Sequence, residues 1–187
     1  MPTSFAAPKP FTAVLEFWFD PVNRPHWFSK SATFDEQIRL QFLATWHAAA
    51  NGQCAPWRAG MDGRLAEIIV LDQFSRNLFR HSAAAYTQDA LALRLAEEAV
   101  VQPEFDAMPQ GARHFMLMPF MHSEDLAVQQ RALVLFAALG DSRTFEIAQR
   151  HKYIIERFGR YPHRNVVLGR ASTAEEEAFL QEPDSSF

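Results

Sequence analysis

The sequence contains a single cysteine, Cys54, so no disulfide can form within the chain. This fits a reducing compartment. No histidine stands near Cys54 in the sequence to activate its thiol, and we interpret it as a packing residue. Charged residues make up only 21% of the chain, with a formal net charge of -4. The chain as a whole therefore lacks the positive charge that would attract nucleic acid or an anionic membrane.

Long apolar runs are also missing. The longest strongly apolar run, ALVLFAALG, is far shorter than the ~20 residues that a membrane-spanning helix needs. The first ten residues, MPTSFAAPKP, lack a charged segment followed by an apolar core, so no signal peptide is expected. We expect a cytoplasmic protein with no membrane partner, and no nucleic-acid partner because its basic segment is short. The oligomeric state is left open.

Strand signals are scarce, because no long stretch alternates apolar and polar residues. Capping residues, glycines and prolines instead divide the chain into about eight helical segments. The hydrophobic fraction of 48%, with 17 phenylalanines, suits one well-filled core. We predict a single all-α domain over residues 1–187, built from TPR-like stacked antiparallel helix pairs (an α–α superhelix) without a sheet. Residues 1–9 are expected to form a flexible tail.

Local signals place the helix ends. Thr33 can cap a helix that runs to about residue 50, and Ser123 can cap one that ends before Gly140. Pro119 is expected to interrupt the helix before it. Thr173, with glutamates after it, has the form of a capping box for a short last helix.

Polar residues interrupt apolar stripes in two of the expected helices. In the helix over 62–77, Asp72 and Arg76 continue the face that carries Ile68 and Ile69. In the helix over 142–158, His151 interrupts an apolar face, which is also typical of a core histidine bonded to a backbone carbonyl. His122 lies just before a helix start, and capping does not explain it.

The segment RFGRYPHRN carries an unusual density of positive charge: Arg157, Arg160 and Arg164, with His163 and Asn165 beside them. Arginine binds carboxylates and phosphates in a planar fork. The negative partner is either a set of carboxylates within the chain or an anionic ligand. We predict that the segment folds back, so that Arg160, His163 and Arg164 face the polar residues of the helices in one pocket.

Three functions remain open from these residues. The first is a binding module for a small anionic molecule or an acidic peptide terminus. The second is an enzyme, a hydrolase or transferase acting on an anionic metabolite, with His122 or His151 as general acid or base. The third is a purely structural polar cluster. The candidate ligand-binding residues are Asp72, Arg76, His122, His151, Arg157, Arg160, His163, Arg164 and Asn165.

Recognised metal and cofactor motifs are absent from the sequence. The segment HSED lacks the histidine spacing of the H-E-x-x-H zinc motif, and no glycine-rich phosphate loop or G-x-S-x-G elbow occurs. His122, Glu124, Asp125 and His151 share no recognised ligand spacing. We expect no metal and no cofactor.

Four phrases in order, VLDQFSRNLFR, PFMHSEDL, RFGRYPHRNVVLGR and STAEEEAFL, resemble a bacterial family. It is the "domain of unknown function nine-two-four" family, and the resemblance runs from residue 14 to the last helix. It implies a TPR-like all-α fold and leaves the activity open. Ser75 stands where the family more usually has proline, which should straighten the helix over 62–77, and Tyr161 stands where phenylalanine is usual.

Overall fold

The computed structural model describes residues 7–183 and residue 185, and these contain helices, turns and loops but no strand. A five-residue π-helical turn, η3 (Val70–Phe74), joins α3 to α4 without a break. The described residues therefore hold eight continuous α-helical stretches, which confirms the all-α prediction. The α-helices are α1 (Phe11–Phe19), α2 (Ala32–Ala50), α3 (Met61–Ile69), α4 (Ser75–Leu78), α5 (Asp89–Ala99), α6 (Gln110–His122), α7 (Leu126–Leu139), α8 (Ser142–Phe158) and α9 (Ala174–Phe179). The 3₁₀ turns are η1 (Arg24–His26), η2 (Ala55–Ala59), η4 (Ala83–Tyr86), η5 (Phe105–Ala107) and η6 (Pro162–Arg164).

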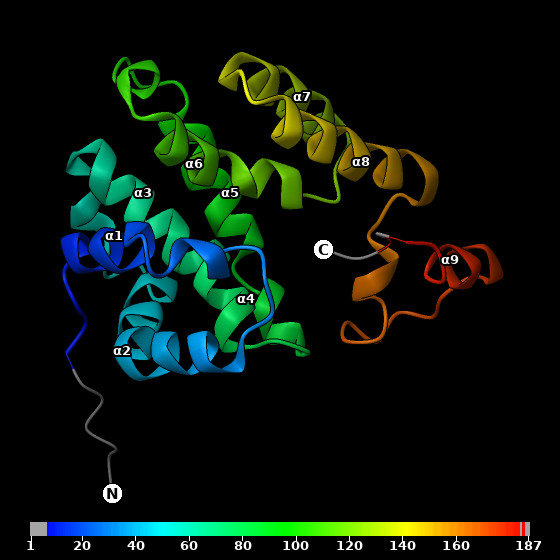
Figure 1. Cartoon of the computed structure of the whole chain (residues 1–187), viewed down its shortest axis with the longest axis horizontal. Helices are drawn as coiled ribbons and strands as arrows, with labels where there is room; N and C mark the ends of the chain where they lie inside the picture. Colours follow the sequence, from blue (N-terminus) through cyan, green and yellow to red (C-terminus); the bar gives the residue numbers. More distant parts are fainter. Residues whose placement is uncertain (1–6, 184, 186–187) are drawn as a thin grey trace, which may run out of the picture.

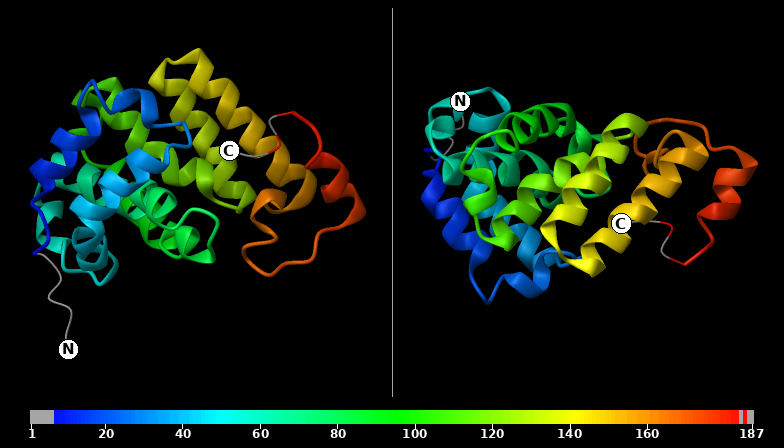
Figure 2. Two further views of the ribbon diagram at one scale, coloured as in Figure 1. Left: turned by 60° about the horizontal axis from the view of Figure 1, so that its bottom comes forward. Right: turned by 90° about the horizontal axis from the view of Figure 1, so that it is seen from above.

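The helices form two connected groups along the long axis of the molecule (Figure 1). In the first group, α3 lies at the centre and packs against α1, α5 and α6, while α2 packs against η3 and α4. In the second, successive helices pack in pairs, α5 with α6, α6 with α7, and α7 with α8. The segment after α8 carries α9 and occupies the end of the molecule away from α1, in both views of Figure 2.

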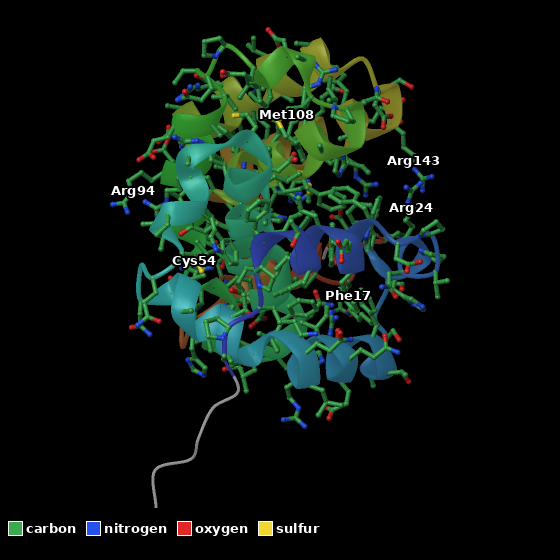
Figure 3. All side chains as sticks on the ribbon, turned by 90° about the vertical axis from the view of Figure 1, so that its left-hand side faces the viewer. Phe17, Arg24, Cys54, Arg94, Met108 and Arg143 are labelled. Atoms are coloured by element: carbon green, nitrogen blue, oxygen red, sulfur yellow. The ribbon has the colours of Figure 1, made fainter. Side chains whose placement is uncertain are left out.

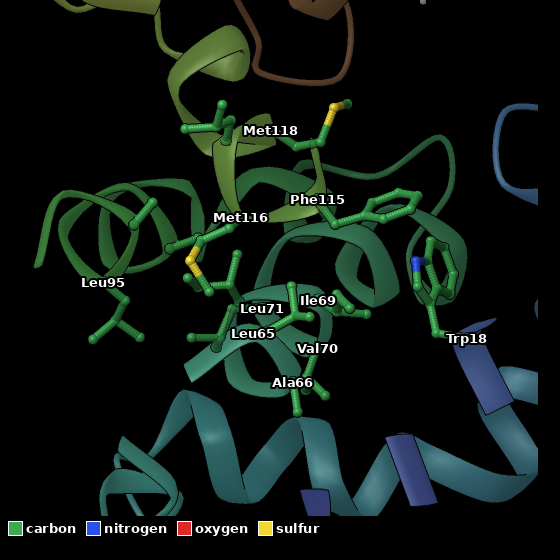
Figure 4. Close-up of a cluster of buried hydrophobic side chains, with 14 of the residues drawn as sticks. Trp18, Leu65, Ala66, Ile69, Val70, Leu71, Leu95, Phe115, Met116 and Met118 are labelled. Atoms are coloured by element: carbon green, nitrogen blue, oxygen red, sulfur yellow. The ribbon is translucent and has the colours of Figure 1, made fainter. Parts of the chain in front are cut away.

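The main core surrounds α3 and η3, as Figure 4 shows. Leu65, Ile69 and Leu71 are at most 2% exposed, and they lie between the side chains of Trp18 and Met116. Fully burying one such aliphatic side chain contributes ~1.5–3 kcal/mol. Every residue from Leu65 to Ser75 is buried, so α3 with η3 is the central element of this fold.

A close approach of two backbones fixes the start of α3. A Cβ atom added to Gly63 would lie 1.9 Å from the carbonyl oxygen of Trp57 in η2. No side chain fits there without moving the backbone. This contact places Trp57 against the first turn of α3, where its ring also meets Phe11 edge to face.

Several helix ends differ from the prediction. The N-cap of α2 is Ser31, not Thr33, and the N-cap of α7 is Asp125, not Ser123. Each side chain accepts a hydrogen bond from a backbone N–H of the first turn, which satisfies a donor that the helix leaves unpaired. Pro119 does not interrupt α6, which continues through it to His122. Pro119 is buried among the core residues of α6, and this packing compensates for the hydrogen bond that a proline removes.

The segment after α8 has a small core of its own. Ile154, Ile155, Tyr161 and Phe179 are each at most 5% exposed and pack together. The capping box predicted at Thr173 is present: its hydroxyl accepts from the N–H of Glu176, whose carboxylate accepts from the N–H of Thr173. The short helix α9 is therefore held by its own cap and by packing on the end of α8.

Cys54, labelled in Figure 3, is only 2% exposed, and burial raises the pKa of its thiol to about 11. This agrees with its interpretation as a packing residue. Of the expected tail, residues 1–6 lie outside the described residues, while the backbone N–H of Lys9 donates to the hydroxyl of Thr45. Over residues 7–183 and 185, none of the helices combines the length and apolar character needed to span a bilayer.

Candidate functional site

Asp72 is placed by the π-helical turn η3. All five residues of this turn are buried, and Asp72 is 1% exposed. The sequence predicted a regular helix over 62–77 with Ser75 straightening its end, and that prediction is wrong over Val70–Phe74, where the hydrogen-bonding widens. Such π turns are frequent at functional sites. Here the turn is buried all round and brings a carboxylate into the interior.

The carboxylate of Asp72 has polar donors on both oxygens. Its Oδ1 lies 2.7 Å from Nδ1 of His122 and 3.1 Å from Nη1 of Arg76, and its Oδ2 accepts from Nε2 of Gln73 at 2.6 Å. Burial alone would raise the pKa of Asp72, but Arg76, His122 and Gln73 outweigh it and hold the pKa well below its usual range. Asp72 is a buried, ionised carboxylate.

Arg76 and Arg164 converge on one carboxylate that the sequence did not single out, Asp89 at the start of α5. Arg76 donates to both oxygens of Asp89, at 3.1 and 3.2 Å, and Arg164 donates from Nη1 at 3.3 Å. Arg164 also donates from Nη2 to the backbone oxygen of His122 at 3.0 Å. We call Asp72, Arg76, Asp89, His122 and Arg164 the central cluster. It joins η3, α4, α5, α6 and η6.

Two tyrosine rings enclose Arg164. Its guanidinium carbon lies 4.6 Å from the ring centre of Tyr86 and 4.5 Å from that of Tyr161. Such cation–π contacts hold a guanidinium in one plane. The side chain is 7% exposed, and its Nε is buried without a hydrogen-bond partner among the described residues. One donor of Arg164 thus remains unsatisfied.

His151 and His163 lie beside the central cluster and not within it. Their rings are 5.7 and 5.6 Å from the ring of Tyr161. Nδ1 of His151 donates to the carbonyl of Ile147 at 2.8 Å, as expected of a core histidine. Burial, reinforced by the positive charge of Arg164, lowers the pKa of each to about 3. Both are neutral at pH 7.

The other predicted residues form a separate C-terminal network. Arg157 donates to Glu175 at 2.9 Å, and Arg160 donates to both carboxylate oxygens of Glu176 at 2.6 and 2.8 Å. Asn165 donates to Glu176 at 3.3 Å. The prediction that Arg160 faces the helix residues is therefore wrong, because the capping glutamate of α9 is a nearer partner. The structure brings together Asp72, Arg76, His122 and Arg164.

Glu124 connects the two networks. It accepts from the backbone N–H of Tyr161 at 2.8 Å and from Arg170 at 2.7 and 3.0 Å. With these pairs, the positive segment finds carboxylates within the chain for Arg157, Arg160 and Arg164.

In the described part of the chain, neither a metal site nor either of two surface hollows coincides with the central cluster. Among the described residues, no three His, Cys, Asp or Glu side chains gather in a way that could hold a metal ion. A hollow of about 650 Å³ is lined by Trp57, Met61 and their neighbours, and one of about 220 Å³ lies at Leu117 and Leu135. No residue of the central cluster lines either hollow. We place the candidate site at the central cluster because its buried charges require an explanation, whereas a surface hollow does not.

Asp89, Tyr86 and Glu176 were missed in the sequence. An acid in the first turn of a helix is already explained by the helix dipole, so nothing marks Asp89 as a partner of distant arginines. Tyr86 lies in the 3₁₀ turn η4, for which no periodic pattern exists. A signal for Glu176 was present in its capping box, but the same carboxylate also binds Arg160.

Comparison with known proteins agrees with the fold and adds no activity. No curated protein matches the chain. The solved structure titled "Structure of Protein of Unknown Function ATU0120 from Agrobacterium tumefaciens" matches with 38% sequence identity and a TM-score of 0.87, over 91% of this chain and 96% of that one. A family model described as "Bacterial protein of unknown function (DUF924)" matches residues 14–184. The chain therefore belongs to the DUF924 family of bacterial proteins.

Proposed function

We propose that the central cluster binds a small anionic molecule or an acidic peptide terminus. The observation that carries this proposal is the unsatisfied Nε of Arg164, which is buried beside a second guanidinium, Arg76. Buried polar groups are nearly always hydrogen-bonded, so an orphan N–H points to an acceptor that is supplied from outside the chain. A carboxylate or phosphate oxygen is the acceptor that a guanidinium binds best.

The rim of the central cluster supports access for such a ligand. The side chains of Arg76 and Asp89 are each 21% exposed, whereas Asp72 beneath them is 1% exposed. An anion at this rim would compete with Asp89 for the two guanidinium groups. Because Asp72 and Asp89 already offset the charge of Arg76 and Arg164, binding would depend on directed hydrogen bonds more than on net charge.

A thermal-shift screen with phosphorylated and carboxylated metabolites tests the proposal. A ligand present at 100 times its Kd adds ~2.7 kcal/mol to the free energy of unfolding. The shift should disappear in Arg164→Gln and persist in Arg157→Gln, a control because Arg157 lies outside the central cluster and pairs with the exposed Glu175. Hits that Arg164→Gln still binds would contradict the proposed site. An absence of hits would favour the purely structural cluster.

A second candidate function is an enzyme, a hydrolase or transferase acting on an anionic metabolite. The observation that favours it is the short contact between His122 and the buried Asp72, an arrangement in which a carboxylate orients a base. His151 is less suited to the role, because its Nδ1 is bonded to a carbonyl and the residue is 3% exposed. Turnover of a screening hit, lost in His122→Gln, would favour the enzyme, and binding without turnover would favour the module.

We also propose a TPR-like arrangement of the helices and a cytoplasmic location for the protein. The pairwise packing of α5 to α8 supports a TPR-like stack, while the position of α3 among α1, α5 and α6 resembles a compact bundle. A cytoplasmic location is supported by the single buried Cys54, which needs no oxidising compartment.

A further inference from the structure

The proton on the ring of His122 can be assigned from its partner. A carboxylate that is ionised can only accept hydrogen bonds, so Nδ1 of His122 must donate to Oδ1 of Asp72 across the 2.7 Å contact. In a neutral imidazole the other nitrogen, Nε2, then carries a lone pair. Burial and the charge of Arg76 lower the pKa of His122 despite the opposite effect of Asp72, which keeps the ring neutral at pH 7.

The Nε2 atom of His122 is the free end of this pair. It makes no hydrogen bond to any described residue, and the side chain retains 11% of its surface exposed. Arg164 donates to the backbone carbonyl oxygen of the same residue at 3.0 Å, and Arg76 lies 3.1 Å from the Oδ1 atom that His122 contacts, so both guanidinium groups belong to the cluster that holds this ring.

We infer that Asp72 is a positioning residue that holds His122 as a neutral proton acceptor, with Nε2 facing the anion in the central cluster. This inference rests on the proposed binding function. When the ligand brings an ionisable O–H, its proton moves to Nε2, and the imidazolium that results is stabilised by the carboxylate of Asp72 on the opposite side of the ring. Gln73 and Arg76 hold the carboxylate in place through hydrogen bonds and an ion pair.

Other charged groups near His122 act on its protonation as well. Arg76 and Asp89 lie on α4 and α5, and Arg164 lies on η6. The neighbouring titratable groups are His114 on the same helix, His151 on α8 and His163 on η6. Burial lowers the pKa of each of these three histidines as it does that of His122, so all four rings are neutral at pH 7.

Nitrogen NMR of the histidine rings tests the inference on the full-length protein. We expect His122 to carry its proton on Nδ1 at pH 7. Inorganic phosphate should raise its pKa measurably, because an anion at Nε2 stabilises the imidazolium. In Asp72→Asn the amide can donate to Nδ1, so the tautomer with a proton on Nε2 should become populated. A proton on Nε2 in the wild type would overturn the inference.

Two comparisons separate this inference from the proposed binding function. Diethyl pyrocarbonate should modify His122 at least tenfold faster than the buried His151 in the wild type, and equal rates would contradict a free Nε2. Phosphate should protect His122 in the wild type but not in Arg164→Gln, in which the tautomer should be unchanged. Phosphate that binds without shifting the pKa of His122 would refute the placement of Nε2. If phosphate does not bind while Nδ1 stays protonated, the anion site fails and the positioning by Asp72 stands.

Discussion

Replacement of Arg164 by alanine should destabilise the protein by about 3 kcal/mol. The change removes a charged hydrogen bond to the carbonyl of His122, which contributes ~1.5–3 kcal/mol. It also removes the cation–π contacts with Tyr86 and Tyr161, which contribute ~0.5–1 kcal/mol each. Asp89 keeps Arg76 as a partner, so no buried carboxylate is left alone, and the loss stays near the lower end of the ~3–5 kcal/mol for a broken buried pair.

Urea unfolding followed by far-UV circular dichroism measures this loss directly. A loss of 3 kcal/mol corresponds to a more than 100-fold change in the unfolding equilibrium constant, since every ~1.4 kcal/mol is tenfold. Arg157→Ala is the matched control, because Arg157 also lies over two aromatic rings, Phe158 and Phe179, but its pair with Glu175 is exposed and such pairs contribute ~0–1 kcal/mol. A loss below about 1 kcal/mol for Arg164→Ala would refute the reasoning and would mark Arg164 as a ligand-binding group with little structural role.

Three other perturbations have calculable directions. Gly63→Ala should destabilise the protein by at least ~1–3 kcal/mol in thermal unfolding, because the added Cβ clashes with the backbone of Trp57. Gly111→Ala is the control: this glycine lies in a helix with open space around it, so the change should be neutral or stabilising by up to ~1 kcal/mol. Equal effects of the two changes would contradict the close approach at Gly63. The melting temperature should fall as the pH is lowered from about 6.5 toward 3. In the unfolded chain His151 and His163 bind protons at their ordinary pKa of 6.5, whereas in the folded protein their pKa values are about 3, so acid favours the unfolded state. A melting temperature that stays constant between pH 7 and 5 would contradict their burial. Thr173→Ala should remove ~1 kcal/mol from the local stability of α9, visible as faster amide hydrogen exchange, and unchanged exchange there would contradict the role of the capping box.

The parts of the fold that depend on local signals could be predicted from the sequence. Gly140 adopts the left-handed conformation at the end of α7, where the sequence indicated a helix end, and Gly159 does the same at the end of α8. The true caps of α2 and α7 lie within two residues of the predicted ones, because serine, threonine and aspartate compete for the same role. Pro119 was misjudged, since a local rule for proline does not include the packing that holds α6 together.

The candidate site was predictable where a residue did not fit its local pattern. Asp72 interrupts an apolar face and His122 is not explained by capping, and the two are in contact. The π turn at η3 could not be found, because its hydrogen-bonding depends on burial from every side. Arg160 was assigned to the wrong network. Its partner is Glu176, 16 residues further along the chain, and sequence patterns do not show which of several carboxylates an arginine will bind.

The connection between Asp89 and Arg164 spans 75 residues, and it has a consequence for the order of folding. During synthesis α3, α4 and α5 emerge first and can pack while Arg164 is still to come, since chains fold from the N-terminus as they are made. Until the C-terminal segment docks, Asp89 has Arg76 as its only cationic partner in the central cluster. Assembly of the cluster is therefore a late event, because it requires Arg164 to have been synthesised. A nascent protein truncated before residue 160 would fold its preceding helices but would lack the central cluster.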